Sequence, residues 1–125
     1  SLICTNPLTG EEIGLICTGK LADVSLQLNC NTFYTWNNFP CGGKLTLAGS
    51  VHHLKIWNYA LMQVDALGLQ TDISLIENYS KGDVTTSTQN QLVYRIDGEG
   101  NIRVNGTPSF VETLSSSGAG KLIYL

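Results

Sequence analysis

The stretch "IWNYA", Ile56–Ala60, is followed twenty positions later by "IENYS", Ile76–Ser80, with isoleucine, asparagine and tyrosine in the same order. The repeat extends in both directions along the chain. Its first position reads Ile16, Trp36, Ile56, Ile76 and Ile96, and its third reads Asn38, Asn58, Asn78 and Gly98. A later position, apolar in four of five coils, reads Val24, Lys44, Val64, Val84 and Val104. Because Asn and Gly readily adopt the left-handed backbone conformation, we expect a recurring corner at the third position. A fixed period of this length is typical of a solenoid.

Short apolar runs with strand-like alternation, such as "VSLQL" at Val24–Leu28 and "VYRI" at Val93–Ile96, are separated by segments rich in Gly, Asn, Ser, Thr and Asp. These patterns indicate strands and turns. The best helical segment, Tyr59–Leu69, keeps the same period, so we expect no helix there. We predict three short strands in each coil, stacked in parallel about 4.8 Å from their copies in the next coil. The predicted fold is an all-β, single-stranded parallel β-helix with about 20 residues per rung and roughly six rungs.

Length and composition indicate one domain and exclude some functions. We predict a single domain over residues 1–125, in which 1–43 form an irregular, cysteine-containing cap with the first rungs and 44–125 form regular rungs. The net charge of −3 argues against nucleic acid as a partner. No apolar run is long enough to cross a membrane. The chain carries no secretory signal, which a mature exported chain would also lack, so export stays open at this point.

The cysteines lie in the first third of the chain, at Cys4, Cys17, Cys30 and Cys41. An even number confined to one end indicates disulfides that hold a terminal cap together in an oxidising compartment. The alternative is that they are small buried hydrophobic residues. There is no CxxC pair, and His52 and His53 point to opposite faces of a strand, so they cannot bind one ion together. We therefore predict no metal site and no cofactor.

The segment Ile96–Leu125 resembles the end of the family called "putative auto-transporter adhesin, head GIN domain". The matching pieces are Gly98–Ile102 and Gly118–Leu122, with "NGTP" at Asn105–Pro108 between them, and the preceding rungs from residue 44 fit more loosely. The resemblance implies a right-handed β-helix that is exported to the cell envelope, in the periplasm or on the outer cell surface, often as a lipoprotein. It implies no catalytic motif.

The aromatic residues Phe39, Tyr59 and Tyr79 occupy one position of the repeat, so we expect their rings to form a column. An exposed column of rings beside polar groups favours sugar binding, whereas a buried one would seal a corner of the core. On the first interpretation the predicted ligand-binding residues are Trp57, Tyr59, Tyr79, Asn58 and Asn78. The partners would be surface glycans or other envelope proteins.

Two carboxylates offer an alternative function. Glu77 and Asp97 are twenty residues apart, and stacked acids could serve a polysaccharide hydrolase or lyase. A tight period leaves little room for the loops of a catalytic cleft, and no GxSxG motif is present. The sequence thus favours a non-catalytic envelope protein that acts in adhesion or recognition. A third hypothesis is a structural surface domain that forms homo-oligomers by burying "KLIYL", Lys121–Leu125.

Overall fold

The computed structural model describes residues 2–17, 23–37, 43–59 and 62–125 of the chain. Within these ranges it contains strands and no helix. The strands are β1 (Leu2–Ile3), β2 (Leu8–Cys17), β3 (Val24–Asn37), β4 (Lys44–Asn58), β5 (Gln63–Asn78), β6 (Val84–Ile96), β7 (Ile102–Asn105), β8 (Phe110–Ser115) and β9 (Leu122–Tyr124). All their pairings are parallel, which confirms a β-solenoid of about six turns with about 20 residues per turn.

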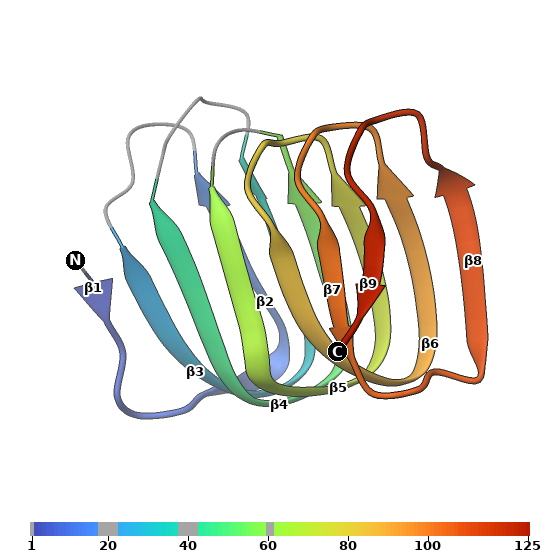
Figure 1. Cartoon of the computed structure of the whole chain (residues 1–125). Coiled ribbons are helices and arrows are strands. Elements are labelled where there is room, and N and C mark those ends of the chain that lie inside the picture. The colour runs from blue at the N-terminus through green and yellow to red at the C-terminus, as the bar shows by residue number, and fades with distance from the viewer. Residues whose placement is uncertain (1, 18–22, 38–42, 60–61) are drawn as a thin grey trace.

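Each central coil is one long strand that bends back on itself (Figure 1). The strands β3 to β6 run down one wall of the solenoid, turn at the lower edge and return along the other. β1, β7 and β9 extend the first wall, and β2 and β8 extend the second. The prediction of three short strands per coil was wrong, because hydrogen bonds to the neighbouring coils continue through the bend. The apolar residues that alternate toward the interior form the core between the two walls.

The number of residues per coil varies around twenty, and this corrects the predicted columns. Ile16 pairs with Trp36, and Ile56 pairs with Ile76, as expected. Trp36, however, pairs with Trp57, 57 − 36 = 21 positions later, and not with Ile56. A shift of one residue moves a side chain to the opposite face of a strand. The predicted column is therefore split, because Ile56 and Ile76 are buried whereas Trp36 and Trp57 face outward.

Shorter coils near the C-terminus shift the register again. Ile96 pairs with Asn78 and not with Ile76, and Val84 pairs with Ile102, after irregularities in the ladder between β5 and β6. The apolar column predicted as Val24, Lys44, Val64, Val84 and Val104 consists instead of Val24, Leu45, Val64, Val84 and Ile102, all of them buried. The column stays apolar because the coil length adjusts to keep a hydrophobic residue on the inner face.

A ladder of buried amides, which we call the asparagine ladder, consists of Asn37, Asn58 and Asn78 at the ends of β3, β4 and β5. Asn37 Nδ2 donates to Asn58 Oδ1 at 3.0 Å, and Asn58 Nδ2 lies 3.3 Å from Asn78 Oδ1. Each of the last two also ties down the following loop, because Asn58 Nδ2 donates to Met62 O at 2.8 Å and Asn78 Nδ2 donates to Gly82 O at 2.9 Å. Amides stacked at the strand spacing thus hold both the coils and their loops.

The asparagine ladder differs from the corner that we predicted. The predicted first member, Asn38, lies outside the described residues, and the position next to Asn58 is occupied by Asn37. No described non-glycine residue has a positive φ, so Asn58 and Asn78 do not act through the left-handed conformation. They form the corner with their side chains instead.

Glycines do shape the loops at the C-terminal end. A Cβ on Gly100 would lie 2.0 Å from Gly82 O, and a Cβ on Gly120 would lie 1.9 Å from Gly100 O. Successive loops are also joined by backbone hydrogen bonds, such as Gly120 N to Gly98 O at 3.0 Å. The "GEG" and "GAG" pieces of the sequence are therefore places where two backbones approach too closely for any side chain.

The N-terminal third contains coils of unequal length where the structure describes it. In β2, Leu8 pairs with Leu28 and Cys17 with Asn37, at an interval of twenty residues, whereas Leu2 of β1 pairs with Val24, 24 − 2 = 22 positions later. The division into an irregular cap and regular rungs stays a prediction. Cys4 and Cys30 form no disulfide and donate to the carbonyls of Asn6 and Thr32, which corrects the disulfide prediction for these two. Cys17 is buried, and Cys41 lies outside the described residues. The described part of the chain has no helix long and apolar enough to cross a membrane.

Replacing Asn58 by alanine should destabilise the fold strongly. The side chain is completely buried, and its removal leaves the Met62 carbonyl and the Asn37 amide without one of their partners. We expect the free energy of unfolding to fall by about 2–4 kcal/mol, measured by urea denaturation. The matched control is Asn31→Ala, which removes an exposed amide that contacts Glu11 and should change stability by less than about 0.5 kcal/mol. Equal effects of the two changes would contradict a special role for the asparagine ladder.

Candidate functional site

Two tyrosines from neighbouring coils stack on the outside of the solenoid. The ring centroids of Tyr59 and Tyr79 lie 4.6 Å apart, and the ring planes differ by 3°. Tyr59 is 49% exposed, so the pair faces solvent and does not seal the core. This confirms a column for these two residues, whereas Phe39 lies outside the described residues. In such a stack the two inner ring faces are covered by each other.

A shallow groove lined by Trp36, Trp57 and Tyr59 lies beside this stack, and we call it the aromatic groove. Trp36 is the last outward-facing residue of β3, and it pairs with Trp57 of β4. Both indoles are partly exposed. Sequence reasoning included Trp57 and Tyr59 in the site but omitted Trp36, because the interval of 21 residues hides its alignment with Trp57.

The remaining predicted ligand-binding residues do not belong to this surface. Asn58 and Asn78 are completely buried, because they form the asparagine ladder, so the prediction that they contact a ligand was wrong. Tyr79 faces outward, but its hydroxyl is engaged with Glu77 Oε1 at 3.0 Å. The accessible site therefore consists of the aromatic groove, with Tyr79 at its margin.

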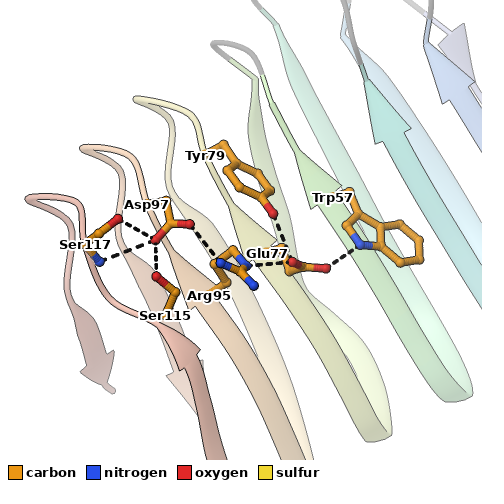
Figure 2. Close-up of polar contacts among 7 residues, drawn as sticks. All are labelled: Trp57, Glu77, Tyr79, Arg95, Asp97, Ser115 and Ser117. Carbon is orange, nitrogen blue, oxygen red and sulfur yellow. Dashed lines mark hydrogen bonds and ion pairs between the residues drawn. The ribbon is translucent and has the colours of Figure 1, made fainter.

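A polar network continues the surface from the aromatic groove toward the C-terminal coils (Figure 2). Glu77 accepts hydrogen bonds from Trp57 Nε1 at 2.5 Å, from Tyr79 Oη at 3.0 Å and from Arg95 Nε at 2.9 Å. Arg95 Nη1 in turn donates to Asp97 Oδ2 at 3.1 Å. Trp57, Glu77 and Arg95 are consecutive members of one outward column, so the register of β4, β5 and β6 brings them together.

Asp97 anchors the far end of the network. Its Oδ1 accepts hydrogen bonds from Ser115 Oγ at 2.6 Å and Ser117 Oγ at 2.7 Å (Figure 2). The hydrogen bonds from Ser115 and Ser117, together with that from Arg95, hold the pKa of Asp97 well below its ordinary value of 3.8. The hydrogen bonds to Asp97 and Glu77 raise the pKa of Arg95. Asp97 and Arg95 are therefore both charged near neutral pH.

The tyrosine in the network stays protonated. Burial and the hydrogen bond to Glu77 raise the pKa of Tyr79 to about 12. Its hydroxyl therefore acts as a donor that fixes the Glu77 carboxylate next to Trp57 Nε1. The Glu77 carboxylate in turn accepts the indole N–H of Trp57. The polar network therefore fixes the position of one wall of the aromatic groove.

The two carboxylates that suggested an enzyme are not directly stacked. Glu77 pairs with Arg95 across β5 and β6, and Asp97 contacts the same guanidinium from beyond the end of β6. They lie on adjacent coils, as predicted, but they are two positions out of register, because this coil is shorter than twenty residues. A glycosidase pair needs one carboxyl with a raised pKa that can donate a proton, and Asp97 has a lowered one.

The two histidines, His52 and His53, lie outside the aromatic groove and the polar network. His52 Nδ1 is 3.0 Å from Asp72 Oδ2 at the lower bend, and His53 faces the outside of the second wall. Burial, Lys55 and His52 lower the pKa of His53. Among the described residues no group of three or more His, Cys, Asp or Glu side chains could hold a metal ion.

Comparisons with known proteins agree with this architecture. A family model described as "Putative auto-transporter adhesin, head GIN domain" matches residues 1–108. The match includes the N-terminal third, which the sequence resemblance left out, and it stops before the Gly118–Leu122 segment that the resemblance used. No curated protein matches the chain.

A crystal structure of a putative adhesin from Bacteroides fragilis NCTC 9343 has the same fold, with a TM-score of 0.76 and 20% sequence identity. The alignment covers 90% of this chain and 53% of that one. The chain therefore spans about half the length of this similar protein. At this identity the likeness concerns the fold alone.

Replacing Asp97 by asparagine should change how stability depends on pH. A carboxylate with a lowered pKa in the folded state stabilises that state at pH above its unfolded value, and this contribution is lost as the pH falls through the folded value. We expect Asp97→Asn to lower the melting temperature at pH 7 and to flatten its decrease between about pH 5 and pH 2.

Thermal unfolding followed by circular dichroism across this range is the measurement. The control is Glu99→Gln, because Glu99 is an exposed acid of the adjacent loop that forms no hydrogen bond with the described residues. The same flattening in both variants would show that the polar network is not the source of the acid sensitivity.

Proposed function

Because the chain belongs to the putative auto-transporter adhesin, head GIN domain family, we propose that it is a non-catalytic adhesion module that binds glycans through the aromatic groove. The observation that carries this proposal is the convergence of Trp36, Trp57 and Tyr59 on one exposed depression. The family and the similar adhesin structure support an adhesion-like module in general. Our proposal adds the class of ligand, which is glycans, and the binding surface, which is the aromatic groove.

The chemistry of the aromatic groove suits a sugar ring. One side of a pyranose presents C–H groups, which pack well against the electron-rich faces of indole and phenol rings. Trp36 and Trp57 come from neighbouring coils, so their spacing is fixed by the backbone ladder and needs no ordering upon binding. The polar network at the edge of the groove supplies carboxylate and guanidinium groups near the sugar hydroxyls.

Several observations support a binding role over a catalytic one. Glu77 accepts three hydrogen bonds, and Asp97 is bonded to two serine hydroxyls and to Arg95, so neither carboxylate is available as a general acid. The lowered pKa of Asp97 opposes proton donation in the same way. The hydrolase or lyase hypothesis would be revived by the release of reducing ends that Glu77→Gln abolishes.

The family also bears on location and assembly. We infer that the protein is exported to the cell envelope, where an adhesion module meets surface glycans, and a lipid anchor in the precursor is part of this proposal. Oligomerisation through Lys121–Leu125 stays a prediction. In the structure Leu122–Tyr124 forms β9 and pairs with β7, while Tyr124 and Leu125 are 54% and 55% exposed.

Replacing Trp57 by alanine should abolish glycan binding while preserving the fold. The indole forms one wall of the aromatic groove, and aromatic residues at the centre of a binding site commonly contribute enough for about a tenfold or larger loss of affinity. The measurement is a glycan array with the intact protein, followed by isothermal titration calorimetry on the best glycan.

The matched control is Tyr124→Ala, which removes an exposed aromatic side chain from β9, at the C-terminal end of the solenoid and outside the aromatic groove. It should leave the affinity unchanged. A glycan that binds Trp57→Ala as tightly as the unmodified protein would exclude the aromatic groove, and no binding across the whole array would count against glycans as ligands.

A further inference from the structure

The outer face of the second wall is a regular grid of side chains. Its central column runs from Gly14 on β2 and Tyr34 on β3 to Lys55, Leu75, Val93 and Glu112, which are paired in this order through β4, β5, β6 and β8. In the last four members the two aliphatic side chains are partly exposed and lie between the two charged ones. We call these four residues the charge-flanked segment.

The two charges cannot reach each other within one molecule. Lys55 and Glu112 are separated by three strand spacings, roughly 14 Å in total. Within the described residues neither side chain forms an ion pair or a hydrogen bond. The face therefore presents an unpaired cation, two aliphatic side chains and an unpaired anion in a straight line.

The order Lys55, Leu75, Val93, Glu112 is complementary to the same four residues of a second copy whose coils run in the opposite order. A second copy that faces the first, related by a twofold axis along the strand direction, places Lys55 opposite the partner's Glu112 and Leu75 opposite the partner's Val93. Each contact then occurs twice, as an isologous interface requires. From this charge complementarity we propose that the outer face of the second wall mediates an antiparallel, face-to-face homodimer of the protein.

The columns on either side are compatible with this arrangement. On one side, reversal places Glu77 opposite the partner's Arg95, so opposite charges meet again. On the other side, it places Ile73 opposite the partner's Gln91 and His53 opposite the partner's Phe110, without any pair of like charges. Phe110 is 49% exposed on β8, so this contact would also cover an apolar ring. The other twofold arrangement, in which the coils keep their order, would bring Lys55 against the partner's Lys55 and is disfavoured.

The geometry also limits the strength of the dimer. The overlap of the two copies spans four neighbouring strands, β4, β5, β6 and β8, a width of roughly 15 Å, which places the interface at the small end of specific contacts. We therefore expect a weak dimer that dissociates on dilution. Trp36 lies one coil beyond the footprint, but Trp57 shares the column of Glu77 and Arg95, so the dimer covers this wall of the aromatic groove.

The test is a charge exchange read out by sedimentation velocity over a series of protein concentrations. Lys55→Glu places two acids opposite each other in both symmetric contacts, and Glu112→Lys places two bases there. Each single variant should raise the dissociation constant of the dimer by about tenfold. The double variant Lys55→Glu with Glu112→Lys restores opposite charges and should recover the original dissociation constant.

The control is Lys121→Glu, which makes the same change of charge outside this face and should leave dimerisation intact. Circular dichroism of every variant confirms that the fold is retained. The proposal is overturned if the unmodified protein is monomeric up to about 1 mM. It is equally overturned if the double variant dimerises no better than the single ones, which would indicate a different interface. Glycan binding is measured separately on Trp57→Ala, so the two proposals can fail independently.

Discussion

The structure depends on amides that stack inside a wall of strands. Asn37, Asn58 and Asn78 each lie at the last position of a long strand. Buried polar groups are stable only when they are paired, and here the partners are the next amide and the carbonyls of the loop. The arrangement works only if the coils are in register. The asparagine ladder therefore couples the position of each loop to the alignment of the whole solenoid.

That alignment also builds the outer surface. Once Asn37 and Asn58 are paired, the preceding residues Trp36 and Trp57 must be paired as well, and strand alternation turns both indoles outward. Tyr59, immediately after the asparagine, is placed on the next coil's Tyr79. The buried ladder and the aromatic groove are thus two consequences of one register. A change in coil length at this position would disrupt the core and the candidate binding site together.

The polar network shows why paired carboxylates in a solenoid are weak evidence for catalysis. Stacking brings ionisable groups close together in any coil, so closeness alone indicates little. The surroundings decide the chemistry. Asp97 is surrounded by donors from Ser115, Ser117 and Arg95, which stabilise its charged form, whereas a general acid needs an environment that favours the neutral form. The same bonds position Trp57 through Glu77, so the network serves the aromatic surface structurally.

The sequence by itself determined the class of fold, because a period of about twenty residues with strand-like alternation can bury its apolar side chains only by stacking coils. It also determined that Tyr59 and Tyr79 stack, since the local interval there is twenty residues. Tertiary structure decided the rest. Coils of unequal length shift the register, so the pairing of Trp36 with Trp57, the burial of Asn58 and Asn78, and the insertion of Arg95 between Glu77 and Asp97 could not be read from a constant period. The physical reason is that the core selects whichever register keeps apolar groups inside, and a single-residue shift exchanges the inner and outer faces of a strand.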